Sequence, residues 1–233
     1  MVPPSGVRQS AARTGGDELT RDAVIGVALS LADSEGLENV TIRRVAQHFS
    51  VTPMALYWHF KNKDELLAAM GDKVFEELRY PPPFVLPWDQ EYRELLDALL
   101  AALRAHPGAV RLAGERVLRC DAGRELTERA LALLRGAGLA VQASSDIART
   151  SLQTMMMLVA DQPGVELGAP REDWEQMLTA KAAAIAALPA DRFPNLVECG
   201  SALVNCDDEN VYYRDGVGLF MAGVKAQVAQ SAG

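Results

Sequence analysis

Residues 41–63 carry four cationic side chains and no carboxylate. The cations are Arg43, Arg44, Lys61 and Lys63, and their guanidinium and ammonium groups donate hydrogen bonds without accepting any. A cluster of positively charged donors suits a polyanion such as the phosphate backbone of a nucleic acid. The chemistry indicated by this stretch is therefore recognition of an anionic surface rather than bond breaking.

Two short helices joined by a tight turn are predicted to position these cations. Thr41 can cap the first helix. Its apolar residues follow helical spacing, at Ile42, Val45, Ala46 and Phe49. Ser50 and Val51 leave room only for a turn, and Thr52-Pro53 places a capping hydroxyl before a proline at the first position of a second helix. In helix-turn-helix proteins such a second helix lies in the major groove of DNA.

The segment LYWHFKNK, residues 56–63, closes this unit, and Asn62 with Glu65 three residues later predicts the cap of a further helix. From Leu19 to Met70 the sequence resembles the TetR family of transcriptional regulators. The resemblance implies an all-α fold, with an N-terminal three-helix DNA-binding domain that contains the helix-turn-helix and a larger C-terminal helical domain for effector binding and dimerisation. From about residue 80 onward no motif is recognised.

The resemblance and the residue chemistry together assign DNA contacts to this unit. Arg43 is expected to contact guanine in a bidentate manner because its family position often reaches the groove, whereas Arg44 is expected to neutralise phosphate; a solvated charge is the alternative for both. Met54 and Ala55 suit the methyl group of thymine. The predicted DNA-binding residues are Thr41, Arg43, Arg44, Thr52, Pro53, Met54, Ala55, Tyr57, His59 and Lys63.

The aromatic residues of this segment divide between surface and core. Tyr57 is assigned to a phosphate through its hydroxyl, with a place in the small core as the alternative. His59 could equally contact phosphate or cap a helix end. Trp58 and Phe60 are expected to hold the small domain together, since large aromatic side chains dominate the packing of small cores.

The charge of the chain is unevenly distributed. Up to Lys63 there are seven Lys and Arg against six Asp and Glu, a net charge of +1, whereas the remainder holds 16 against 25, a net charge of −9. The acidic part need not touch DNA, and it discourages non-specific binding.

Helices broken by Gly and Pro are predicted along the whole chain. A first helix at residues 20–34 is expected to pack against the helix-turn-helix. The helix after Asn62 is expected to run to Arg79, where Tyr80 and three prolines end it. By resemblance, this helix connects the DNA-binding domain to the effector-binding domain. The later helices are expected at residues 88–105, 109–118, 123–135, 142–160, 172–188 and 209–228, with a short turn near residues 193–198. The domains are then a disordered arm at 1–17, the helix-turn-helix domain at 18–65 and the effector-binding and dimerisation domain at 66–233.

The second domain is expected, by resemblance, to enclose a small, largely apolar effector and to form a homodimer. The predicted ligand-binding residues are Leu99, Leu103, His106, Arg116, Val117, Gln153, Met155 and Trp174. The predicted dimer-interface residues are Ile147, Leu152, Met156, Val159, Tyr213, Val217, Phe220, Met221 and Val224. Filling of the core of one chain is the alternative for the second set.

Other classes of protein find little support. The three histidines and three cysteines lack metal-ligand spacing, and no phosphate loop, GxSxG or HExxH motif occurs, so neither an enzyme nor a cofactor is expected. No apolar run reaches the roughly 18 residues of a membrane span, which predicts a cytoplasmic protein. The sequence thus predicts a ligand-responsive repressor that binds a palindromic operator as a dimer; an effector-independent activator or architectural factor is the alternative.

Overall fold

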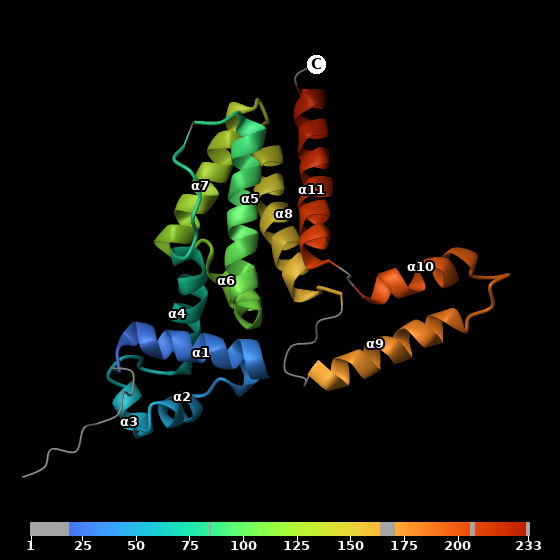
Figure 1. The fold of residues 1–233 in the computed structure, drawn as a ribbon. Coiled ribbons are helices and arrows are strands. Elements are labelled where there is room, and N and C mark those ends of the chain that lie inside the picture. Colours follow the sequence, from blue (N-terminus) through green and yellow to red (C-terminus); the bar gives the residue numbers. More distant parts are fainter. Residues whose placement is uncertain (1–18, 84, 164–170, 206–207, 232–233) are drawn as a thin grey trace, which may run out of the picture.

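The computed structural model describes residues 19–83, 85–163, 171–205 and 208–231, with side chains omitted for residues 171–174. Helices are the only regular elements in this part of the chain, in agreement with the predicted all-α class (Figure 1). They are α1 Arg21–Glu35, α2 Ile42–His48, α3 Pro53–Leu56, α4 Lys63–Glu76, α5 Trp88–Ala105, α6 Val110–Arg116, α7 Asp121–Gly136, α8 Val141–Ala160, α9 Arg171–Ala186, α10 Pro194–Val204 and α11 Glu209–Ser231, with 3-10 turns η1 Leu37–Asn39 and η2 Pro107–Ala109.

The first three helices form a compact unit, here called the head (residues 19–62). The hydroxyl of Thr20 caps α1 by accepting from the N–H of Ala23, and Thr41 caps α2 by accepting from the N–H of Arg44. Ser50, with a φ of +55°, makes the turn between α2 and α3. Fully or nearly fully buried side chains fill the centre of the head: Val24, Ala28, Leu29, Val40, Val45, Leu56 and Phe60.

The helices α3 and α4 both end in tight turns. After Leu56 the chain continues as a tight turn, in which the N–H groups of both His59 and Phe60 donate to the carbonyl of Leu56. The helix α4 ends at Glu76 rather than Arg79, because the N–H of Leu78 donates to Phe75, three residues back, and tightens the last turn.

The helices α5–α8 and α11 form the body, in which α5, α7, α8 and α11 stand side by side (Figure 1), and α4 connects the head to it. The helix α5 lies at its centre and buries one apolar stripe, made by Tyr92, Leu95, Leu96, Leu99, Leu100 and Leu103. Gly216 allows α11 to approach α8 closely, since a Cβ there would lie 2.7 Å from Leu158 Cδ2. Gly216 therefore serves a close helix contact within one chain.

A hairpin of α9 and α10 extends away from the body (Figure 1). The sequence predicted only a short turn near residues 193–198, whereas Pro194 begins a helix of 11 residues. Proline at the first position starts the helix, and Gly200 lets it lie directly against Ile185 of α9.

The corner between α6 and α7 is tightly closed. Gly123 lies in the first turn of α7, and a Cβ on it would overlap the backbone carbonyl of Val117. Only glycine fits this position without displacing the backbone.

Candidate DNA-reading surface and effector cavity

The outer surface of α2 and α3 carries the predicted base-contacting residues. Arg43 and Thr52 are exposed, and the Met54 side chain is 68% exposed. The Thr52 hydroxyl makes no bond to the helix that follows it, although its position is that of a cap. The hydroxyl therefore keeps both its proton and its lone pairs available, while Thr41 uses an oxygen lone pair to cap α2.

Arg44, expected to neutralise phosphate, is instead paired with a carboxylate of its own chain. Its Nη2 donates to Glu35 Oε1 at 2.7 Å, so the end of α1 is tied to the start of α2. Glu35 precedes Arg44 by nine residues, and the turn η1 brings the two together. Arg43, Lys61 and Lys63 have no ion pair with any described residue, which leaves them as the cations of this cluster best placed for an external anion.

The aromatic residues divide differently from the prediction. Phe60 is buried as expected, and the guanidinium of Arg21 lies 4.8 Å from the centre of its ring. Trp58, predicted for the core, is 89% exposed, because the tight turn after α3 directs it away from the head. Tyr57 is 47% exposed, and His59 is half-buried.

The start of α4 offers a second group of donors beside these side chains. Asn62 Oδ1 accepts from the N–H of Glu65 at 2.8 Å, which confirms the predicted cap, and Glu65 accepts from the N–H of Lys61. Lys63 occupies the first position of the helix, where the positive end of the helix dipole adds to its own charge. The arrangement attracts an anion such as a phosphate.

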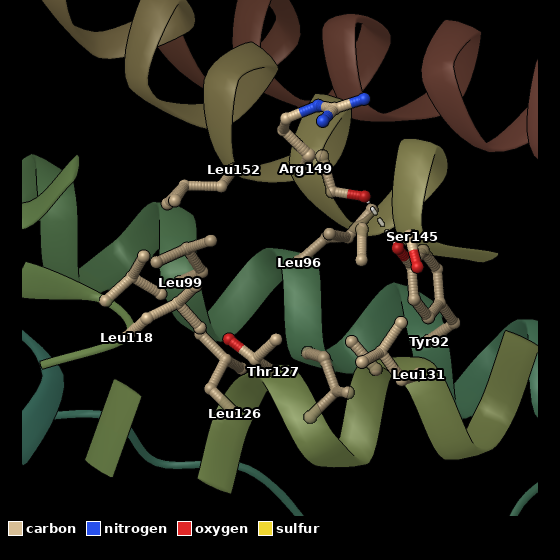
Figure 2. Close-up of a pocket in the computed structure, with 15 residues that line it drawn as sticks. Tyr92, Leu96, Leu99, Leu118, Leu126, Thr127, Leu131, Ser145, Arg149 and Leu152 are labelled. Carbon is tan, nitrogen blue, oxygen red and sulfur yellow. Dashed lines mark hydrogen bonds between the residues drawn. The ribbon is translucent and has the colours of Figure 1, made fainter. Parts of the chain in front are cut away.

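A cavity of about 400 Å³ lies in the body between α5, α7 and α8, with the α6–α7 corner at one end. Figure 2 shows leucines from these helices converging on it, with Tyr92 and Ser145 at one end and Leu118 at the other. Its lining is made by Tyr92, Leu95, Leu96, Leu99, Val117, Leu118, Leu126, Thr127, Ala130, Leu131, Ser145, Ala148, Arg149, Ser151 and Leu152.

The hydroxyl groups of the lining all use their protons within the protein. Ser151 donates to the carbonyl of Ile147 at 2.7 Å, so the Tyr92 hydroxyl, 2.6 Å from Ser151 Oγ, acts as donor to it. Burial raises the pKa of Tyr92 to about 12, more than its bond with Ser151 lowers it, and keeps the phenol protonated. Ser145 and Thr127 donate to backbone carbonyls of their own helices.

Towards the cavity, these hydroxyls therefore offer lone pairs rather than protons. Arg149 is the one lining side chain with a charge, and it is exposed at the rim and paired with Asp146. The interior of the cavity is thus apolar, with hydrogen-bond acceptors at Tyr92, Thr127 and Ser145.

Two of the predicted ligand-binding residues, Leu99 and Val117, line the cavity. The structure places most of the others elsewhere. Leu103 and Met155 are buried in the packed core, and Gln153 is exposed. Arg116 points to α4, where its Nε lies 2.6 Å from Asp72 Oδ1, and the side chain of Trp174 is outside the described residues.

His106 also lies away from the cavity, at the end of α5 that faces the head. Its Nε2 is 3.0 Å from Glu77 Oε2 and its Nδ1 is 3.5 Å from Asp33 Oδ2. A side chain held between two carboxylates is poorly placed to anchor a ligand in the body.

The predicted dimer residues of α8 and α11 are mostly directed inward. Within their own chain the structure buries Ile147, Val159, Tyr213, Val217, Met221 and Val224, and half-buries Leu152, Met156 and Phe220. Leu152 also lines the cavity. The apolar stripes that suggested an interface face α5 and each other, because those neighbours lie beside them in the bundle. The outward faces of the two helices carry Met157, 57% exposed, and Leu219, 78% exposed.

Sequence reasoning missed the polar end of the cavity. Tyr92 stands within the leucine stripe of α5, and Ser151 stands within the apolar stripe of α8. A polar residue at an otherwise apolar helical position was the available signal, although the sequence does not say that the two residues meet across 59 positions.

The chain matches two family models. Residues 24–70 match the bacterial regulatory proteins of the tetR family, and residues 87–228 match the tetracyclin repressor-like C-terminal domain. The second match covers the part of the sequence in which no motif was recognised. No helix of the described part is long and apolar enough to span a bilayer, and no group of potential metal ligands occurs there.

An HTH-type transcriptional regulator of Saccharopolyspora erythraea is 31% identical over 120 residues, which are 52% of this chain and 51% of that protein. The chain spans about half the length of the curated relatives it matches. ActR of Streptomyces coelicolor, solved in complex with actinorhodin, is 27% identical with a TM-score of 0.70 over 91% of this chain and 99% of that one. BioQ of Mycobacterium smegmatis is 25% identical with a TM-score of 0.60 over 90% and 99%. BioQ with its double-stranded DNA operator is 31% identical with a TM-score of 0.54 over 62% and 88%.

Proposed function

Since the chain belongs to the tetR family of bacterial regulatory proteins, we propose that it is a ligand-responsive repressor of transcription. As a homodimer it blocks a palindromic operator in the cytoplasm, and a small, largely apolar effector releases it. The observation that carries the proposal is the combination in one chain of a head with exposed unpaired cations and a body with an apolar cavity.

The exposed surface of the head supports operator binding. Arg43 and Thr52 offer donors for base edges, and Met54 offers an apolar contact for a thymine methyl group. Tyr57, Lys63 and the start of α4 are the proposed phosphate contacts. The proposed role of Arg44 changes, because its pairing with Glu35 makes it a support for α2 rather than a free cation.

The contact between α6 and α4 supports communication between cavity and head. Val117 and Leu118, at the end of α6, line the cavity. On the opposite side α6 packs directly on α4, since a Cβ on Gly71 would lie 3.0 Å from the carbonyl oxygen of Leu112. Arg116 adds two bonds to Asp72, of 2.6 and 3.0 Å. A ligand that displaces the α6–α7 corner would move α4, and with it the spacing of the two heads of a dimer.

The outward faces of α8 and α11 are the proposed dimer surface. Gly223 faces open space, with nothing within 4 Å of the position of its Cβ, and Leu219 is 78% exposed on the same helix. Together with Met157 of α8 they provide an apolar surface with small residues, which suits close packing of helices from a second chain. A two-fold dimer matches two operator half-sites about one helical turn, or a multiple, apart.

The lining of the cavity restricts the effector further. Because Tyr92 and Ser145 present lone pairs to the cavity, an effector with a phenol or amine donor should bind better than one whose only polar groups are acceptors. A matched pair of probes tests this: 1-naphthol against 1-methoxynaphthalene, which differs by methylation of the donor. The naphthol should raise the melting temperature more in a thermal-shift measurement. Equal shifts, or a larger shift with the ether, would contradict this assignment.

Fluorescence anisotropy on the intergenic DNA beside the protein's own gene tests the proposed function. Titrations at two salt concentrations give the number of phosphate contacts from the salt slope. Tight, salt-sensitive, two-fold-symmetric binding is expected, and Tyr57→Ala should weaken it. If the protein binds this intergenic DNA no more tightly than random DNA, a genome-wide selection of bound fragments decides whether the operator lies elsewhere or the proposal fails.

An effector screen separates the proposal from the effector-independent activator or architectural factor. A ligand at about 100 times its dissociation constant should stabilise the protein by about 2.7 kcal/mol. A ligand that stabilises the protein and lowers its affinity for the operator supports the repressor. Operator binding that no cavity ligand alters would favour the alternative.

A further inference from the structure

Apart from α4, the head touches the body mainly at the turn η2. The last turn of α1 lies on Gly108, and a Cβ at Gly108 would overlap the backbone of Ala32. The N–H of Gly108 donates to Asp33 Oδ1 at 2.8 Å. The orientation of the head is therefore set at two places, the α4–α6 contact and this smaller joint between α1 and η2.

His106 lies at the centre of the joint, directly before η2. Its imidazole is 19% exposed and lies between Asp33 of α1 and Glu77, which follows α4. A neutral imidazole has one N–H and turns a lone pair to the other side, so it can favour only one of the two carboxylates. A protonated ring presents an N–H to each. Asp33 also lies near the C-terminus of α1, where the negative end of the helix dipole favours a cation.

The local charges agree with a protonated ring. The Asp33 carboxylate is the largest cause of a pKa of His106 above its ordinary value; burial opposes it, and Glu77 adds to it. These two carboxylates are the charged groups of the described chain that act on the ring, one from the end of α1 and one from the end of α4. Both belong to segments that connect directly to the DNA-reading surface.

We propose that His106 is a positioning residue, whose imidazolium ties the ends of α1 and α4 to the body and so holds the head at the angle from which it reads DNA. The proposal rests on the proposed function, in that the head is taken to be the DNA reader. A head that is already held at the binding angle loses less conformational entropy when it binds DNA. Proton release from His106 therefore loosens the joint and weakens operator binding without removing any contact to DNA.

The pH dependence has a definite sign. Because the pKa of His106 is raised in the folded protein, its contribution is complete below the ordinary pKa of histidine and is lost as the pH rises through the raised value. Operator affinity of the wild-type protein should fall by about fivefold across this step, the lower end of typical coupling between sites. His106→Gln should bind more weakly at low pH and lack the step. Glu77→Gln should move the step to lower pH, because one of the two charges that raise the pKa is gone.

The measurement is anisotropy with the operator fragment from about pH 5.5 to about pH 8.5, the range in which histidine titrates. His48→Gln is the matched control, since His48 is exposed on the head and should leave the step in place. The salt slope should be the same for the wild type and His106→Gln, because no phosphate contact is lost. Parallel pH profiles for these two proteins, or tighter binding by His106→Gln, would overturn the proposal.

A second measurement needs no DNA and separates a failure of this proposal from a failure of the proposed function. Amide hydrogen exchange is followed in the peptides that contain the last turn of α1 and the turn η2, with correction for the intrinsic pH dependence of exchange. Protection should decrease with rising pH in the wild type and remain constant in His106→Gln. Protection that follows the same course in both proteins contradicts the joint even if the operator is never found.

Discussion

In the head, Leu29, Leu56 and Phe60 are almost fully enclosed by neighbouring side chains, whereas in the body Leu99 and Leu126 each border a cavity of about 400 Å³. The head also turns its unpaired cations outward, while the body buries the hydroxyl of Tyr92 beside its cavity. A surface that reads DNA must keep its shape, so dense packing suits the head. In a body that responds to a ligand, side chains around the cavity lack van der Waals contacts on one side until the ligand provides them.

Matched leucine truncations give the largest expected difference between these regions. Leu56→Ala removes a side chain that is 0% exposed and should lower the free energy of unfolding by about 3–5 kcal/mol. Leu99→Ala should cost about 2–3 kcal/mol, because one side of this leucine already lacks neighbours. Urea unfolding of both variants measures the two losses. Equal losses would show that the body is packed as densely as the head.

The next largest effect concerns specificity. Arg43→Ala should relax the preference for one base pair by about 1–3 kcal/mol, as expected for loss of a bidentate contact to guanine. Competition titrations with single-base operator variants measure it. Arg44→Ala is the control, since its guanidinium is engaged with Glu35; it should leave the preference unchanged and lower stability slightly. If only Arg44→Ala relaxed the base-pair preference, Arg44 rather than Arg43 would be the base-contacting residue.

Removal of one hydroxyl in each region compares buried and exposed polar groups. Tyr92→Phe deletes the donor to Ser151 and should lower stability by about 1 kcal/mol. Tyr57→Phe should change stability by less than about 0.5 kcal/mol, because this tyrosine is exposed, but it should weaken binding to DNA. Thermal unfolding and anisotropy of both variants test the pair. Weaker DNA binding by Tyr92→Phe alone would contradict the division of roles.

The smallest effect is expected at the start of α4. Lys63→Ala should weaken binding to all DNA sequences alike and reduce the salt slope by about 1, the amount for one phosphate contact. Titrations of operator and random DNA at several salt concentrations measure both quantities. A loss confined to the operator would make Lys63 a base-reading residue instead.

The head could be predicted from sequence more fully than the body, for local reasons. The caps at Thr41 and Asn62 and the proline that begins α3 each depend on residues within one turn of a helix, so their positions follow from sequence alone. Trp58 was misplaced because its direction depends on the tight turn that ends α3 early. The Arg44–Glu35 pair was missed because it depends on how α1 and α2 meet.

The cavity could be predicted as apolar but not outlined. Its walls come from α5, α7, α8 and the α6–α7 corner, and periodicity shows that a stripe faces inward without showing whether it meets a neighbour or a space. Leu99 borders the cavity whereas Leu103, one turn later on the same stripe, is in the packed core. The apolar stripes of α8 and α11 are ambiguous in the same way, since periodicity does not show whether a stripe faces a helix of its own chain or of a second chain. The cavity and the dimer surface can be placed only when the neighbouring helices are known.

The corner at Gly123 has a consequence for the use of this protein as a biosensor. A side chain there would collide with the backbone of Val117 rather than with a movable side chain, so Gly123 itself cannot be varied without displacing the corner. Libraries that seek a new analyte should instead vary Leu126, Leu131 and Leu152, which line the cavity from α7 and α8. Clones altered at Gly123 are expected to lose response to every compound, whereas clones altered at the three leucines can exchange one compound for another.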